Sequence, residues 1–422
     1  MSNLKYYLKS PFLISALACA FFLYAFTLPS MSGKRPEIPA SMDCLKSISG
    51  SVSLNPSKSG SGKTYSTEIA LSSVGMVRGG VEFRSEASGK IKVMIPSSIV
   101  EAVYPGKLHS VSSSAVLIEN GEKISCTGVW SDSIGAFMAE SVTYEGYDDS
   151  FWGVISHFRA VCRLMFKRLM FSWGHAGGLL LSLLSGAREY LEDGLGDSFR
   201  LAGLSHVLAL SGMHLSFFSS MAGGVGKTIS KRIMPFFQLS GILFFVWFAG
   251  MSPSLFRALV CSLISLTARC LMCRKVDTLE VLACTFLIHA AFKPQDLSSV
   301  AFMLSYAALA GILVFSGLIN RLMAPVFPPM LSGSLSASFG AQLATCPISL
   351  AFFGSFAPVG IVSTVFISPM IGLFISVSMI FMASSFAFPF LSGAFGSIMN
   401  LFYDGMACIV RFFAGFPPIQ IT

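Results

Sequence analysis

The chain has 422 residues, of which 53% are hydrophobic and only 12% are charged. Its mean hydropathy of +0.71 is typical of a multi-pass membrane protein and excludes an ordinary soluble enzyme. The formal net charge is +8, yet residues 40–150 hold 9 Lys and Arg against 12 Asp and Glu, so the basic excess belongs to the rest of the chain.

Residues 10–28 form the first apolar span, and Lys5 and Lys9 precede it. The excess of cations before a span favours a cytoplasmic N-terminus, so residues 1–30 are predicted to be a transmembrane anchor. A cleaved signal peptide is the alternative, since the length fits. However, Thr27-Leu-Pro29 lacks a small-x-small cleavage site.

Residues 40–150 contain short alternating segments rich in β-branched residues, and Asn120-Gly121 is a strong hairpin signal. This pattern predicts a small external β-barrel of five to seven strands. Cys44 and Cys126 flank this domain and would be able to form a disulfide in an oxidising compartment.

Residues 151–200 change to a helical period. Arg159, Arg163 and Lys167 stand at i, i+4 and i+8, so the sequence predicts a basic amphipathic helix at the membrane interface. These cations would contact lipid headgroups, a polyanionic substrate, or both. Gly174–Gly186 is apolar but too short to span, which indicates an interfacial or re-entrant helix together with the polar residues that follow it.

Residues 201–422 are predicted to be a polytopic transmembrane domain, because apolar stretches follow one another closely. Pro358 and Pro369 interrupt one of these stretches, which is therefore expected to hold two short helices or a re-entrant pair. The predicted spans are 204–225, 233–250, 253–272, 277–292, 297–319, 333–353, the interrupted region 356–386, and 391–414.

Residues 203–216 are apolar, yet they carry His206, Ser211 and His214. If the stretch is one helix, 100° per residue places these three side chains within a sector of about 140°. Ionisable groups at membrane depth usually face a bundle interior or a water-filled cavity. The alternative is that the histidines only hydrogen-bond between packed helices.

Four stretches carry a resemblance to a known family. Leu204-Ser-His-Val-Leu-Ala-Leu-Ser-Gly-Met-His-Leu resembles the "SHLLAISGLHV" signature of the ComEC competence family, with Met213 where the family usually has Leu. Gly250-Met-Ser-Pro-Ser-Leu-Phe-Arg-Ala258 is similar to "GxSPSxxRA", and Leu297-Ser-Ser-Val-Ala-Phe-Met-Leu-Ser-Tyr-Ala307 is similar to "FQLSFxA". Gln342-Leu-Ala-Thr-Cys-Pro-Ile-Ser-Leu-Ala-Phe-Phe-Gly354 resembles "QLATLPLxxxxFG". The family-motif residues are Ser205, His206, Ser211, Gly212, His214, Pro253, Arg257, Ser305, Gln342 and Pro347.

The resemblance implies an inner-membrane channel that carries single-stranded DNA into the cytoplasm during natural transformation, with an OB-fold as the external domain. It also implies an external DNA receptor and a cytosolic ATP-driven DNA translocase as partners. The polyanion that Arg159, Arg163 and Lys167 would contact is then DNA at the channel mouth. Many members of the family carry a C-terminal metallo-β-lactamase-like domain with a His-x-His-x-Asp-His cluster. That cluster is absent from this sequence, so we expect no enzyme activity, no metal and no cofactor, and a separate nuclease.

Arg257 is the charge whose role the sequence leaves open. Ser252-Pro253 indicates a helix start, which places Arg257 about one turn inside the membrane. There it would either extend to water or contact substrate or protein. In the fourth motif, Pro347 is expected to kink its helix, and Gln342 offers an uncharged donor and acceptor.

Two other functions stay open. A small-solute secondary transporter would have paired repeats with broken helices, for which 356–386 and Gly174–Gly186 are candidates. A membrane-embedded hydrolase would use His206 and His214 together and would need a carboxylate close to them.

Overall fold

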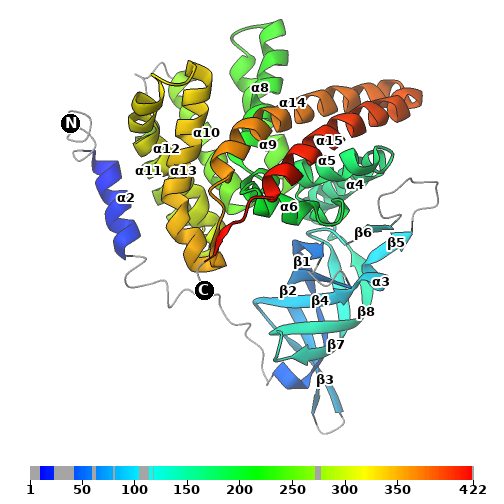
Figure 1. Cartoon of the computed structure of the whole chain (residues 1–422). Helices are drawn as coiled ribbons and strands as arrows, with labels where there is room; N and C mark the ends of the chain where they lie inside the picture. The colour runs from blue at the N-terminus through cyan, green and yellow to red at the C-terminus, as the bar shows by residue number, and fades with distance from the viewer. Residues whose placement is uncertain are drawn as a thin grey trace. The chain divides into compact units, whose positions relative to one another are not determined.

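The computed structural model describes residues 10–22, 42–58, 63–78, 81–103, 114–116, 118–270 and 277–420. The chain is mostly helical and divides into two compact units (Figure 1). The β unit comprises residues 33–182 and 187–191, and the helical unit comprises residues 1–32, 183–186 and 192–422.

The β unit is built on one six-stranded sheet with the strand order β1-β7-β8-β4-β2-β3, in which β1 also pairs with β2. Its strands are β1 Leu45–Lys58, β2 Thr64–Arg78, β3 Val81–Glu86, β4 Lys90–Pro96, β7 Lys123–Ser131 and β8 Ala136–Gly146. After β4 the chain forms α3 Ser97–Val100, and β5 Glu101–Val103 pairs with β6 Ser114–Val116.

Glycines allow this sheet to curl. Gly50 in β1 and Gly128 in β7 lie at register shifts, where a bulge bends the strand. A side chain at Gly50 would place its Cβ only 2.1 Å from the carbonyl oxygen of Ala70. β4 and β8 pair in parallel over just two residue pairs, so the sheet is curled but is not a closed barrel. The prediction of a small β-barrel was therefore right about the strands and wrong about full closure.

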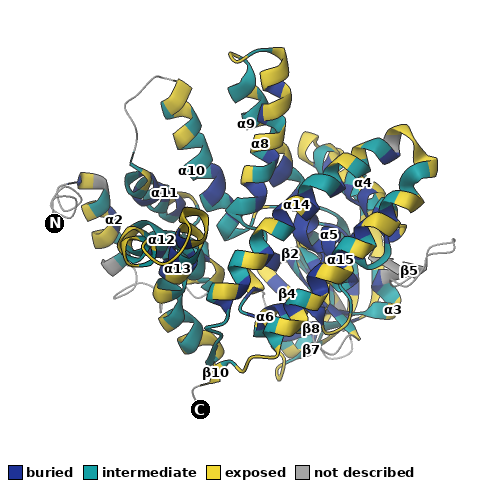
Figure 2. Ribbon diagram, turned by 45° about the horizontal axis from the view of Figure 1, so that its top comes forward, coloured by how far each residue is buried: buried dark blue, intermediate teal, exposed yellow. Residues whose placement is uncertain are grey.

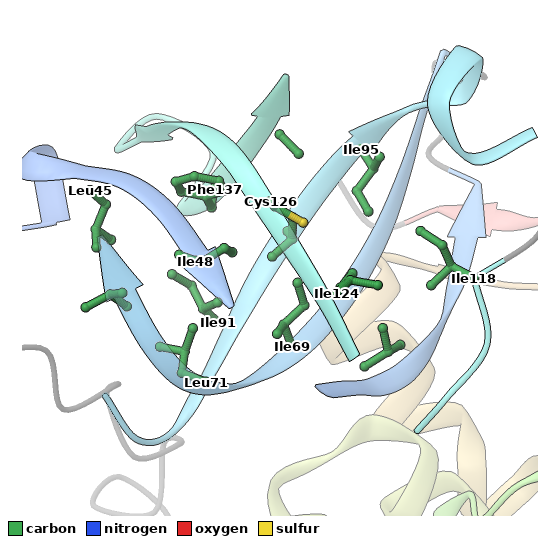
Figure 3. Close-up of a cluster of buried hydrophobic side chains, with 14 of the residues drawn as sticks. Leu45, Ile48, Ile69, Leu71, Ile91, Ile95, Ile118, Ile124, Cys126 and Phe137 are labelled. Carbon is green, nitrogen blue, oxygen red and sulfur yellow. The ribbon is translucent and has the colours of Figure 1, made fainter. Parts of the chain in front are cut away.

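The inner face of the sheet is a hydrophobic core, shown in Figure 3. Ile48, Ile69, Ile124 and Phe137 are completely buried there. Cys126 belongs to the same core and is a free thiol, so the predicted disulfide with Cys44 is not present. Burial raises the pKa of the Cys126 thiol to about 12, which keeps it protonated.

Helix α4, Phe151–Phe171, belongs to the β unit, whereas the sequence placed it in a separate interfacial segment. Arg163 Nε and Lys167 Nζ donate to the two carboxylate oxygens of Glu119 at 2.8 and 2.7 Å. All three side chains are at most 6% exposed. Arg159 donates to the carbonyl oxygen of Asn120 at 3.0 Å. The prediction that Arg163 and Lys167 contact headgroups or DNA is therefore wrong, because a buried carboxylate binds both.

The helical unit contains five helices long and apolar enough to cross a bilayer, among the residues that the structure describes. They are α10 Pro253–Cys270, α12 Val300–Met323, α13 Pro329–Phe353, α14 Gly360–Ala387 and α15 Ser392–Ala414. The other helices of ten or more residues are α2 Pro11–Phe22, α5 Gly174–Ser185 (whose first nine residues lie in the β unit), α8 Gly212–Ile229, α9 Met234–Ala249 and α11 Thr278–Phe292. The short elements of the helical unit are α6 Leu195–Leu201, α7 Ser205–Leu208, η5 Pro294–Ser298 and η6 Pro389–Leu391, and β9 Ser355–Phe356 pairs with β10 Ile419–Gln420. Two further short helices, η3 Met42–Cys44 and η4 Arg188–Tyr190, belong to the β unit. The chain is thus a multi-pass membrane protein.

Many large apolar residues of the long helices are exposed. The ribbon in Figure 2 is coloured by burial and marks exposed residues on α12 and α13. Leu318 is 63% exposed and Leu343 is 50% exposed. Water would make such surfaces costly, whereas lipid tails accommodate them. The pattern agrees with a protein that is surrounded by a bilayer.

Two predictions about helix boundaries need correction. The region 356–386 is not broken at Pro369, because α14 continues through that residue. A proline removes one backbone hydrogen bond, and a helix of 28 residues retains enough others to continue. The predicted span from residue 204 is interrupted and begins as a continuous helix only at Gly212. Of the predicted anchor, the described part is α2, which packs against α11.

Glu119→Gln tests the buried ion cluster. We expect the substitution to lower the free energy of unfolding by about 3–5 kcal/mol at pH 7, because it removes the charged carboxylate to which both buried cations donate. The pKa of Glu119 is raised by burial but lowered further by Lys167 and Arg163, so it lies below its ordinary value of 4.5. The cluster's contribution should thus be complete above about pH 4.5 and disappear as the pH falls through the folded-state pKa.

The measurement is the thermal unfolding midpoint of the full chain in detergent from pH 7 down to pH 4. Glu68→Gln is the matched control, since Glu68 forms an exposed pair with Lys90 at 4.0 Å and should contribute less than about 1 kcal/mol. Equal effects of the two substitutions at pH 7 would contradict the assignment.

Candidate functional site

The stretch that carries the first motif is a break between two helices. Helix α7 ends at Leu208, Ala209 is extended, and Ser211 is extended again before α8 begins at Gly212. The prediction that His206, Ser211 and His214 share one face of a single helix is therefore wrong. His206 lies on α7, Ser211 is the N-cap of α8, and His214 lies in the first turn of α8.

The local cause of the break is a capping box. The Nδ1 atom of His214 accepts a hydrogen bond from the backbone N–H of Ser211 at 3.2 Å, and the Ser211 side chain caps the backbone of the first turn. This Ser-x-x-His arrangement replaces the usual Glu or Gln at the third position. Because the cap satisfies backbone groups that a continuous helix would otherwise pair, it favours a new helix start at this position.

The cap also fixes the chemistry of His214. A ring nitrogen that accepts a hydrogen bond carries no proton, so the neutral ring carries its proton on Nε2. His214 is completely buried, and Nε2 has no hydrogen-bond partner within the described residues. The first motif thus directs an unsatisfied N–H donor into the interior of the helical unit.

The second motif, at the start of α10, contacts the break between α7 and α8. Ser254 Oγ donates to the carbonyl oxygen of Leu210 at 2.6 Å and so satisfies a backbone group that no helix pairs. Ser252 Oγ accepts from the N–H of Leu255, which confirms that α10 starts at Pro253. A Cβ added to Gly212 would lie 3.3 Å from Ala258, so only a small residue allows α8 to start this close to α10.

Arg257 lies between the second and third motifs. Its Nη1 atom donates to the carbonyl oxygen of Ser305 at 2.5 Å, and its Cζ lies 5.9 Å from the centre of the Tyr306 ring. Its Nη2 atom lies 3.8 Å from the position that a Gly212 side chain would occupy. The structure thus favours a protein contact over extension to water. Arg257 Nε and Ser305 Oγ are buried and have no hydrogen-bond partner among the described residues.

The fourth motif contacts the break from its other end. Gly203, just before α7, lies so close to Gly360 that a Cβ added to Gly203 would be 2.7 Å from Gly360 Cα. The Gln342 side chain lies against the same glycine, since a Cβ at Gly360 would be 2.5 Å from Gln342 Nε2. Ser363 Oγ donates to the carbonyl oxygen of Ala202 at 2.7 Å. Gln342 Oε1 is buried and lacks a partner in the described structure, and Pro347 lies further along α13.

The sequence did not identify one network in this region. His289 is completely buried, its Nε2 lies 3.1 Å from Asp296 Oδ2, and its Nδ1 lies 3.2 Å from the Tyr306 hydroxyl. Tyr306 is the residue over which Arg257 lies, so the network helps to hold the segment that binds Arg257. The available signal was a histidine near the end of an apolar helix, followed by an aspartate directly before the third motif.

The four motifs thus meet around one helix break, and each contributes a buried polar atom that has no hydrogen-bond partner in the part of the chain that the structure describes. These atoms are His214 Nε2, Arg257 Nε, Ser305 Oγ and Gln342 Oε1. Ser205 and His206 are exposed at the same break. Arg159, Arg163, Lys167 and the two cysteines belong to the β unit and are not part of this arrangement. Within the described ranges, no three His, Cys, Asp or Glu side chains lie close enough together to hold a metal ion.

Gly203→Ala tests the close approach to Gly360, with Gly194→Ala as the matched control. Both glycines have a positive φ, +72° and +77°, so both substitutions incur the left-handed backbone strain of about 1–2 kcal/mol. Only Gly203 has backbone atoms within contact of the added methyl group, which should cost about 1–3 kcal/mol more. The thermal unfolding midpoint of the full chain should fall further for Gly203→Ala, and equal losses would show that the two backbones do not meet.

Comparisons with known proteins cover the part of the chain that contains this site. The sequence model of a family described as "Competence protein" matches residues 183–422, which is more than half of the chain. ComE operon protein 3 of Bacillus subtilis (strain 168) is 25% identical over 191 residues, covering 44% of this chain and 23% of that protein. No solved structure matches the chain. The matched region includes all four motifs and every helix that meets at the break. The chain belongs to the Competence protein family.

Proposed function

We propose that this protein is a transmembrane channel that carries single-stranded DNA across the bacterial cytoplasmic membrane during natural transformation. The observation that carries the proposal is a set of four buried polar atoms, one from each motif, around a helix break in a membrane protein; none of them has a hydrogen-bond partner among the described residues. Each buried polar group without a partner costs about 1–3 kcal/mol, so such a cluster indicates a place that meets water or a polar substrate.

The chemistry of the cluster suits a strand in transit. It offers N–H donors on His214 and Arg257 for phosphate or base acceptors, and a hydroxyl and an amide oxygen for base donors. Conduction requires weak or multiple contacts rather than one tight clamp. A single cation beside neutral polar groups meets that requirement better than a cluster of arginines would.

The geometry disfavours the two alternative functions. A hydrolase would need His206 and His214 to act together, but they lie on different helices and the cap engages Nδ1 of His214. The secondary-transporter hypothesis needs paired broken helices, and the structure removes the break expected at Pro369, because α14 continues through that residue.

For the β unit we propose an external OB-like domain. The support is a curled, partly open sheet in which β1 pairs with both β2 and β7. In the sheet itself, Tyr65 is buried in the core, and Phe83 and Tyr144 are 54% and 40% exposed, so the sheet offers limited aromatic surface for base stacking. The domain therefore suits docking of an external DNA receptor better than binding of single strands. A cytosolic ATP-driven translocase and a separate nuclease complete the proposed partners.

The first test is deletion of the gene in its host, with DNA bound at the cell surface and DNA reaching the cytoplasm assayed separately. The proposal predicts that surface binding is retained and arrival is lost. Unchanged arrival of DNA in the deletion strain would contradict it.

His214→Glu and His214→Gln separate the cap from the polar pathway. Both residues retain the capping box, but only glutamine also keeps an N–H donor, because an ionised carboxylate has none. A hydrogen bond to a charged group is worth about 1.5–3 kcal/mol, so DNA arrival at equal protein abundance should be roughly ten- to a hundredfold lower for His214→Glu than for His214→Gln. His214→Ala should lower both abundance and arrival. Equal arrival with the Glu and Gln variants would assign the histidine to capping alone.

Arg257→Gln removes the charge that lies beside the break and binds Ser305. We expect DNA arrival to fall strongly with surface binding unchanged, as measured by uptake of labelled DNA. The control is Arg269→Gln, since Arg269 is exposed in the last turn of the same helix. Similar arrival in the two variants, at equal protein abundance, would remove Arg257 from the proposed pathway.

A further inference from the structure

The basic face of helix α4 is buried and its apolar face is exposed, which is the reverse of the usual arrangement in a surface helix. Its cations Arg163 and Lys167 point inward to Glu119, within the β unit. The polar stripe of this amphipathic helix is therefore already occupied by protein.

The opposite face of α4 is exposed and apolar. Val154, Phe158, Val161 and Met165 recur every three or four residues, so they form one stripe along the helix. They are 60%, 63%, 36% and 57% exposed. Phe151 and Trp152 at the start of α4 are each 74% exposed, and Figure 2 shows exposed residues along this helix.

The charged residues of α4 indicate what kind of surface the apolar stripe can contact. The helix contains no Asp or Glu, and Arg168 is an exposed cation near its end. An apolar stripe with an aromatic end and without acidic residues suits the boundary between lipid headgroups and acyl chains. Exposing an apolar stripe of this kind to water would be energetically unfavourable.

The position of α4 in the chain identifies the partner. α4 ends at Phe171, the apolar α5 begins at Gly174, and the five candidate spans follow in the same chain. The β unit is thus tethered to a membrane by the residues that directly follow α4. With 21 residues, α4 extends about 31 Å, long enough to lie along a bilayer surface.

We infer that α4 docks the β unit on the bilayer by its apolar face, with Val154, Phe158, Val161 and Met165 among the lipid acyl chains. The buried cluster of Glu119 with Arg163 and Lys167 then holds the sheet to the helix from the other side. This inference does not depend on what the protein transports.

Site-specific photo-cross-linking tests this docking in the full chain in its native membrane. The photoreactive amino acid p-benzoylphenylalanine replaces Phe158 in one variant and Met165 in another. Leu318 in α12, which is 63% exposed on a candidate span, is the lipid-facing reference position. Phe83 in β3, which is 54% exposed on the sheet, is the matched position in the β unit away from α4.

After irradiation, intact-mass analysis should show a gain of one phospholipid at positions 158 and 165, comparable with position 318 and absent at position 83. A cross-linked dimer at 158 and 165 would instead assign the stripe to a second copy of the chain. A cross-link to a different protein, or no adduct while position 318 reacts, would equally overturn the inference.

Discussion

The constraint on which the helical unit depends is that backbone groups inside a membrane must be paired. Helix α7 ends at Leu208 and α8 starts only at Gly212, which leaves backbone groups without helical partners. Ser211 and His214 satisfy the start of α8, and Ser254 satisfies the carbonyl of Leu210. Side chains from two of the four motifs therefore stabilise the break through hydrogen bonds to its backbone.

The same requirement explains why the motifs are far apart in sequence and together in space. Gly212 allows α10 to approach, and Gly203 and Gly360 allow α14 to approach. The network of Asp296, His289 and Tyr306 supports the segment whose carbonyl binds Arg257. Once these close contacts form, polar atoms from all four segments are buried around the break, and the arrangement has a polar interior inside an apolar exterior.

Periodicity and composition were sufficient to predict most of the long apolar helices, because few capping or breaking residues interrupt their apolar pattern. They predicted α9 to α13 and α15 to within a few residues. They failed where one side chain decides the outcome. The capping box of Ser211 and His214 starts a new helix within a stretch whose apolar residues continue without interruption. Pro369 is a residue that often ends a helix, yet α14 continues through it. The cations of α4 were assigned to a partner outside the protein because Glu119, 44 residues before Arg163, gave no local signal.

We propose that DNA passes the helix break where the four motifs meet. The most direct measurement places a photoreactive residue at Ser205, which is exposed at the break, in cells that take up labelled DNA. Leu322 in α12, which is 72% exposed on a candidate span, is the control position. We expect a cross-link between the transported strand and position 205, and none at position 322. Continued uptake without a cross-link at 205, or equal cross-linking at both positions, would contradict it.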